Sequence, residues 1–190
     1  MNVVDYVVFT GWVVFWLGWL AAAFGAKAGR NRWSRFACVR VAIILLVLLF
    51  LRLGVIRPHG ALHGNLSAAT SSPWLQGIGL ALFVLGLALA VWARFFLGRN
   101  WGMPMSEKAD PELVRSGPYR YIRHPIYSGI ILAMIGTTVA VSVYWLIAAV
   151  VIGAYFISSA VVEERTMTRR FPDVYPEYKR ETKMLIPFIL

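Results

Sequence analysis

The chain has 190 residues, of which 59% are hydrophobic and only 15% charged, and its mean hydropathy is +0.65. Soluble domains carry about 45–50% apolar and about 25% charged residues, so this composition argues against a soluble globular protein. It also excludes a disordered chain and a disulfide-stapled one. The remaining class is a polytopic membrane protein, and the length limits it to one domain. A formal charge of +10 lies on this apolar background.

Four charge-poor stretches predict the membrane-spanning helices, since a helix needs about 20 apolar residues to cross the hydrocarbon core. The first three cover residues 3–24, 36–56 and 74–97. The fourth, residues 126–162, contains no charge, and as one helix it would be about 55 Å long, too long for a single crossing. Its β-branched and hydroxylated middle, residues 137–143, favours a helical hairpin. We therefore expect an all-α fold with five transmembrane helices, the last two forming the hairpin.

The basic residues are distributed asymmetrically along the chain. Sixteen of the 19 Lys and Arg residues lie in segments 25–35, 94–124 and 163–190, and five crossings place these segments on one side. Because cytoplasmic loops are enriched in Lys and Arg, we predict that the N-terminus lies outside and the C-terminus in the cytoplasm. This orientation accounts for most of the positive charge without nucleic acid as a partner.

The outer loop and the second crossing offer little chemistry. His59 and His63 have an i,i+4 spacing but no carboxylate near them in the sequence, so we expect no metal site there. Cys38 is interpreted as a small buried residue. The first apolar run has no preceding basic residue, which is not typical of a signal peptide.

Polar side chains concentrate in two cytoplasmic stretches, residues 115–129 and 163–187. The first enters the predicted hairpin and the second leaves it, so both meet at the same membrane surface. Pro125 suits the first turn of the helix that follows it. The unpaired N–H groups and positive dipole end of that turn favour an anion close to His124.

Glu163 and Glu164 stand where the last predicted crossing leaves the lipid, and carboxylates there accept hydrogen bonds from hydroxyl or ammonium groups. Simpler interpretations stay open for these features. In these interpretations, the arginines of the stretch 115–129 anchor the protein at the membrane surface, and its tyrosines form an interfacial aromatic belt. Glu163 and Glu164 would then only form ion pairs with Arg165 and Arg169. His124 on its own is more often a hydrogen-bonded interfacial histidine than a base.

A thirteen-residue run and a set of downstream residues form a specific pattern, namely Gly117-Pro118-Tyr119-Arg120-Tyr121-Ile122-Arg123-His124-Pro125-Ile126-Tyr127-Ser128-Gly129, then Glu163-Glu164, Phe171, Tyr175, Tyr178 and Pro187. This pattern resembles the isoprenylcysteine carboxyl methyltransferase family and the wider group of phospholipid methyltransferase-like membrane enzymes. The resemblance covers residues 94–190, which we interpret as the methyltransferase-like core. Residues 1–93 are then the N-terminal transmembrane helices with most of the third span.

The resemblance implies S-adenosylmethionine as the methyl donor, a cytosolic cofactor pocket, and a lipid-like acceptor that enters from the surrounding membrane lipids. The matching positions imply cofactor contacts from Glu112, Leu113, Val114, Tyr119, His124, Pro125, Ile126, Tyr127 and Glu163, with His124, Arg123 and Glu164 as catalytic candidates. A cationic sulfonium suits carboxylates and aromatic faces. A carboxylate acceptor needs no general base, whereas an amine must first lose a proton.

One departure from the family pattern concerns the acceptor. Eukaryotic-type isoprenylcysteine enzymes have an arginine about one helical turn before the acidic residue that holds the cofactor, and Ser159 stands there in this chain. Arg94, Arg99 or Arg165 would have to replace that arginine as the partner of a carboxylate acceptor. Two other functions stay open: an NADPH-dependent membrane reductase related to the longer sterol reductases, and a non-enzymatic membrane protein on the same scaffold.

Overall fold

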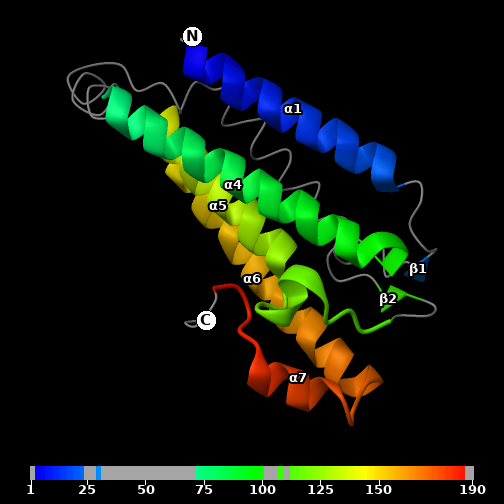
Figure 1. The fold of residues 1–190 in the computed structure, drawn as a ribbon. Helices are drawn as coiled ribbons and strands as arrows, with labels where there is room; N and C mark the ends of the chain where they lie inside the picture. The colour runs from blue at the N-terminus through cyan, green and yellow to red at the C-terminus, as the bar shows by residue number, and fades with distance from the viewer. Residues whose placement is uncertain (1–2, 24–28, 31–71, 101–106, 109–111, 187–190) are drawn as a thin grey trace.

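The structure, a computed structural model, describes residues 3–23, 29–30, 72–100, 107–108 and 112–186 (Figure 1). In chain order its elements are α1 (Val3–Ala23), β1 (Gly29–Arg30), α4 (Pro73–Leu97), the 3₁₀ turn η1 (Gly98–Asn100), β2 (Glu107–Lys108), the 3₁₀ turn η2 (Gly117–Arg120), α5 (Pro125–Ala140), α6 (Trp145–Arg170) and α7 (Tyr175–Glu181). The predicted helical architecture is confirmed over these residues. The short antiparallel ladder of β1 and β2 is an addition that the sequence pattern did not predict.

Three of the described helices are long and apolar enough to cross a membrane: Val3–Ala22, Pro73–Leu97 and Trp145–Arg170. These helices identify the chain as an integral membrane protein. Helix α5 has 16 residues, and at 1.5 Å per residue it is about 24 Å long, shorter than the hydrocarbon core of about 30 Å. The predicted crossing at 36–56, with Cys38, lies outside the described residues, as do His59 and His63.

The long uncharged stretch is divided into α5 and α6 by residues 141–144. Thr137 and Thr138, in the stretch expected to form the break, are still in α5, and their hydroxyls donate to the carbonyls of Ala133 and Met134, each at 2.9 Å. Such bonds to the carbonyl four residues earlier satisfy a hydroxyl inside a helix. Helix α6 then runs back along α5 and extends past its start (Figure 1), so Glu164 of α6 lies beside Arg123, just before α5.

Small residues bring α4 and α5 into close contact. A Cβ added to Gly86 would lie 2.4 Å from the backbone nitrogen of Ala133, and one added to Gly79 would lie 2.4 Å from that of Ala140. From the other side, a Cβ on Gly136 would lie 2.4 Å from the backbone nitrogen of Phe83. Close approach through glycine and alanine is how membrane helices gain packing contacts without a hydrophobic driving force.

Helix α1 packs against α4 and α5, and one of its three tryptophans, Trp12, contacts both of these helices. The Trp12 Nε1 donates to the Thr137 hydroxyl of α5 at 3.1 Å, and the Trp12 ring meets Phe83 of α4 edge to face at 5.6 Å. These two contacts join α1 to the pair formed by α4 and α5. Figure 1 shows α1 running beside α4.

The C-terminal segment returns from α7 to the segment that precedes α5. Ile122 and Lys183 form a parallel bridge, in which the Arg123 amide donates to the carbonyl of Lys183 at 2.8 Å and the Lys183 amide to that of Tyr121 at 3.3 Å. Next to the bridge, the His124 amide donates to the carbonyl of Met184 at 3.1 Å. The Ser128 hydroxyl donates to the carbonyl of Leu185 at 2.6 Å. Segments more than 50 residues apart thus lie side by side at one end of α5.

Candidate active site

The site is built on an irregular turn that ends at the first residue of α5. Gly117 has a φ of +59°, a conformation that L side chains rarely adopt, and a Cβ there would lie 2.6 Å from the Phe96 ring of α4. His124 is the N-cap of α5, Pro125 is its first residue, and no side chain caps this end. Because the first-turn amides of a helix have no intrahelical acceptor, this terminus keeps its affinity for an anion.

Glu164 is a buried carboxylate held by two cations. The Arg123 Nε lies 2.6 Å from the Glu164 Oε1, and the Lys179 Nζ lies 2.7 Å from the Oε2. Only 6% of the Glu164 side chain is exposed. The ion pairs join α6, α7 and the segment before α5, and they compensate the cost of burying this charge.

Glu163, the preceding residue, faces a different set of partners. It accepts a hydrogen bond of 2.6 Å from the Tyr127 hydroxyl, and its Oε2 lies 3.6 Å from the His124 Nδ1. Its side chain is 26% exposed, compared with 6% for Glu164. Two adjacent glutamates therefore have different surroundings, and Glu163 is the more accessible of the pair.

His124 lies between the two carboxylates. Its Nε2 is 3.7 Å from the Glu164 Oε1, which is beyond hydrogen-bonding distance, and this nitrogen has no hydrogen-bond partner among the described residues. The ring stacks on Tyr127 with 5.4 Å between centroids and 2° between planes, and Tyr127 stacks in turn on Phe156 at 4.6 Å. The stack sets the plane of the imidazole.

The C-terminal segment closes the back of the site. The Arg123 Nη1 donates to the carbonyl of Thr182 and, at 3.2 Å, to that of Lys179. The Tyr178 hydroxyl donates to the carbonyl of Tyr119 at 2.6 Å. Burial raises the pKa of Tyr178 to about 12, although Arg123 acts in the opposite direction.

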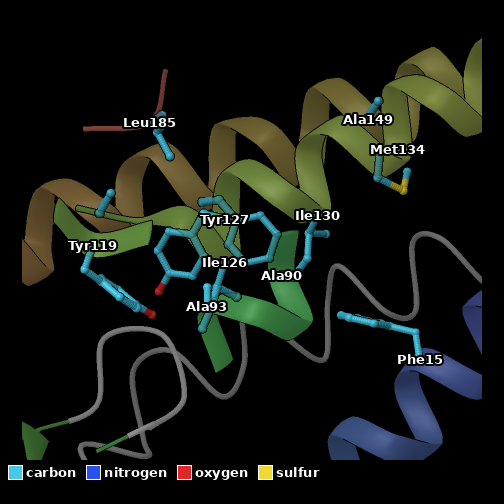
Figure 2. Packing of buried hydrophobic residues seen from close by; sticks show 12 residues of the cluster. Phe15, Ala90, Ala93, Tyr119, Ile126, Tyr127, Ile130, Met134, Ala149 and Leu185 are labelled. Carbon is cyan, nitrogen blue, oxygen red and sulfur yellow. The ribbon is translucent and has the colours of Figure 1, made fainter. Parts of the chain in front are cut away.

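The other predicted cofactor residues lie on the turn and in the adjoining core. Tyr119, Ile126 and Tyr127 are buried in one cluster, beside Ala93 of α4 and Leu185 of the C-terminal segment (Figure 2). Pro125 is fully buried, and Leu113 and Val114 are partly buried. Glu112 is exposed and accepts a hydrogen bond of 3.0 Å from Asn100, at the end of η1.

Among the residues considered as partners of a carboxylate acceptor, Arg94 and Ser159 have other hydrogen-bond partners, and Arg165 is exposed. The Arg94 guanidinium donates to the carbonyls of Gly98 and Ala22 at 2.6 and 2.8 Å, so it joins the ends of α4 and α1. Ser159 is buried and donates to the carbonyl of Tyr155 at 2.8 Å. Arg165 is exposed on α6, and the side chain of Arg99 lies outside the described residues.

Sequence reasoning missed Lys179 and Phe156 as parts of this site. In the sequence, Lys179 is one of several cytoplasmic cations, and Phe156 is one of many apolar residues in a crossing. A weak signal exists for Phe156, because it lies seven residues before Glu163 and so shares its face of α6. No local signal identifies Lys179, whose partner Glu164 is on another helix.

Comparisons with known proteins identify the family of this chain. Residues 74–174 match the model of the phospholipid methyltransferase family. The chain is 33% identical over 120 residues to protein-S-isoprenylcysteine O-methyltransferase of Mus musculus, which covers 61% of this chain and 42% of that protein. It is 28% identical over 127 residues to methanethiol S-methyltransferase of a Pseudomonas species, covering 61% of this chain and 48% of that protein.

A solved structure shares the fold. It is that of the eukaryotic intramembrane Ras methyltransferase ICMT (isoprenylcysteine carboxyl methyltransferase), with a TM-score of 0.56 and 22% sequence identity, covering 84% of this chain and 55% of that one. This chain spans less than half the length of the two curated relatives and about half that of the solved protein. The family match, however, includes the turn, α5 and both glutamates of α6. The chain therefore belongs to the phospholipid methyltransferase family, as the run from Gly117 to Gly129 and the Glu163-Glu164 pair predict.

Proposed function

We propose that this chain transfers a methyl group from S-adenosylmethionine to a lipid-like acceptor in the membrane. The observation that carries the proposal is the group formed by His124, Tyr127 and Glu163 at the uncapped start of α5. The named relatives, an O-methyltransferase and an S-methyltransferase, support the reaction class.

The residues of this group suit the donor chemically. Bound S-adenosylmethionine supplies an electrophilic methyl group on a cationic sulfonium. The Glu163 carboxylate attracts a cation or accepts hydrogen bonds from ribose hydroxyls, while the α5 N-terminus suits the donor's carboxylate. We assign donor binding to Glu163 and Tyr127 together with Glu112, Leu113, Val114, Tyr119, His124, Pro125 and Ile126.

His124 is the residue that we expect to contact the acceptor. Its buried Nε2, without a hydrogen-bond partner among the described residues, is able to receive a proton from an acceptor that has one to lose. Arg123 and Glu164 are engaged with each other and with Lys179, so we expect them to orient the site. This role differs from the general-base role that Glu164 would have as an unpaired carboxylate.

We further infer that α5 and α6 form a hairpin within a five-helix arrangement whose N-terminus lies outside and whose C-terminus is cytoplasmic. The concentration of basic residues in three segments supports this orientation. In an Arg180→Cys variant with Cys38 changed to Ser, the new thiol should react with a membrane-impermeant reagent in inside-out vesicles and not in intact cells. Reaction in intact cells would reverse the orientation.

Methyl transfer is tested with purified protein, labelled S-adenosylmethionine and a total lipid extract, followed by identification of the labelled product. The expected result is one labelled lipid class with wild-type protein and with Arg180→Met, an exposed control on α7, and strongly reduced label with His124→Ala. Isothermal titration with S-adenosylhomocysteine and with NADPH provides a second readout. Binding of NADPH alone would replace the methyltransferase proposal with a reductase, and binding of neither would indicate a non-enzymatic protein.

A further inference from the structure

Lys179 contributes a charged side chain to the site from α7. Its Nζ lies 2.7 Å from the Glu164 Oε2, while the Arg123 Nε occupies the other carboxylate oxygen at 2.6 Å. The lysine side chain is half exposed, whereas those of Glu164 and Arg123 are 6% and 7% exposed. A half-exposed cation thus binds the second oxygen of a buried carboxylate whose first oxygen already binds Arg123.

The orientation of the Glu164 carboxylate affects a third neighbouring side chain, that of His124. Its Oε1 lies 3.7 Å from the His124 Nε2, a gap that a small rotation of the carboxylate would close. With one cation on each oxygen, the carboxylate is held in its present orientation. His124 meanwhile lies parallel to Tyr127, which itself donates to Glu163.

The same cations are connected to the backbone that carries His124. Arg123 donates from its side chain to the carbonyl of Lys179 and from its amide to that of Lys183. The His124 amide donates to the carbonyl of Met184. Substitution of the Lys179 side chain leaves these carbonyls in place, so it acts through the Glu164 carboxylate, whose other cation, Arg123, is next to the imidazole in the chain.

We propose that Lys179 is a positioning residue for His124 and acts through Glu164. Without the ammonium, the Oε2 of Glu164 loses its cation, and the carboxylate turns towards the His124 Nε2. The imidazole then leaves the plane set by Tyr127 and is no longer held for the acceptor. This inference rests on the proposed methyl transfer and adds a residue that the sequence pattern did not identify.

The test compares Lys179→Met with Lys179→Arg and with Arg180→Met, which removes a neighbouring exposed cation from the same helix. We expect Lys179→Met to lower kcat about tenfold, because orientation at the reacting centre is lost. The dissociation constant for S-adenosylhomocysteine should change less than about threefold, since Glu163 remains on α6. Lys179→Arg should recover most of kcat, and Arg180→Met should retain wild-type values.

A double-mutant cycle decides whether Lys179 acts through Glu164. In a Glu164→Gln background the added Lys179→Met change should lower kcat less than about twofold, because the charge that the lysine pairs with is already absent. An equal effect in both backgrounds, or wild-type kcat in Lys179→Met, would overturn the proposal. If Glu164→Gln does not fold, failure of Lys179→Arg to recover kcat would overturn it instead.

Hydrogen exchange gives a readout that does not depend on the reaction. The Arg123 and His124 amides should exchange faster in Lys179→Met than in wild type or Arg180→Met, since the network beside their hydrogen bonds is weakened. Unchanged exchange would contradict the link between Lys179 and His124. Absence of methyl transfer by the wild-type protein would instead refute the proposed function, and the exchange result would still stand.

Discussion

The Nε of Arg123 lies 2.6 Å from the Oε1 of Glu164, and both side chains are buried at the junction of three segments. Arg123 precedes α5 by two residues, while Glu164 lies near the end of α6. This ion pair therefore holds the two ends of the uncharged stretch together, and it does so beside His124. Its integrity determines both the stability of this end of the molecule and the geometry of the site.

Removal of the buried carboxylate should destabilise the protein strongly. Glu164→Ala leaves Arg123 buried without its partner, and breaking one side of such a pair costs about 3 kcal/mol or more. The measurement is thermal unfolding in detergent, followed by tryptophan fluorescence. Glu181→Ala, an exposed control on α7, should change the melting temperature little, and an equal effect of the two variants would contradict the structural role of Glu164.

Loss of the more accessible glutamate should affect ligand binding more than stability. Glu163→Gln retains the shape of the side chain but removes the negative charge of the carboxylate, which accepts a hydrogen bond from Tyr127. Because hydrogen bonds to a charged acceptor are stronger, we expect affinity for S-adenosylhomocysteine to fall about tenfold. Isothermal titration measures this change, with Glu181→Gln as the matched control. Unchanged affinity in both Glu163→Gln and His124→Ala, with folded protein, would refute the proposed donor site.

The close contact of α4 and α5 makes Gly86 intolerant of a side chain. Gly86→Ala places a methyl group 2.4 Å from the backbone of Ala133, so the helices must separate, at a cost of about 1–3 kcal/mol. Gly77→Ala is a control on the same helix, because nothing lies within 4 Å of its added Cβ. Thermal unfolding should show a lower melting temperature for Gly86→Ala alone. Equal melting temperatures would mean that the two helices do not approach as closely as described.

Ionisation of Tyr178 should weaken the fold at high pH. Its pKa is about 12 in the folded protein, above the ordinary value of 10.0, because the phenol is buried. The folded state therefore holds this proton more tightly, and the associated stability is complete below pH 10 and lost as the pH rises towards 12. Tyr178→Phe should be less stable than wild type at pH 8, having lost the hydrogen bond to Tyr119, but should lose less stability between pH 10 and 12.

Denaturant unfolding at several pH values between 8 and 12 checks this difference in slope. Tyr6→Phe, an exposed position on α1, serves as the control and should follow the wild-type curve. Parallel curves for wild type and Tyr178→Phe would show that the Tyr178 phenol does not couple to folding.

Much of the helical architecture follows from local composition. Apolar stretches such as 74–97 predict membrane helices because a desolvated backbone must satisfy its hydrogen bonds within the segment. The length of the fourth stretch predicts a break, and its β-branched, hydroxylated residues 137–143 place the break a few residues before its observed position at 141–144. Thr137 and Thr138 lie in α5, and their hydroxyls bond to carbonyls of the same helix, which β-branching alone does not reveal.

The candidate site, like the fold, is predicted only in part by the sequence. The run around His124 and the acidic pair identify which segments meet, because the motif and the topology are both properties of the sequence. The pattern does not distinguish the roles of Glu163 and Glu164, and it assigns no role to Lys179. Successive residues of a helix point about 100° apart, so the two glutamates meet different neighbours only once α6 has packed.

The sequence by itself thus determined an apolar helical membrane chain, the asymmetry of its charges and the motif that marks its family. The tertiary structure decided which carboxylate is buried between Arg123 and Lys179 and which one faces Tyr127. The physical reason is distance along the chain. Hydropathy and turn chemistry act within a few residues, whereas the partners of Glu164 come from segments that precede and follow it by many residues and meet only when the helices are packed.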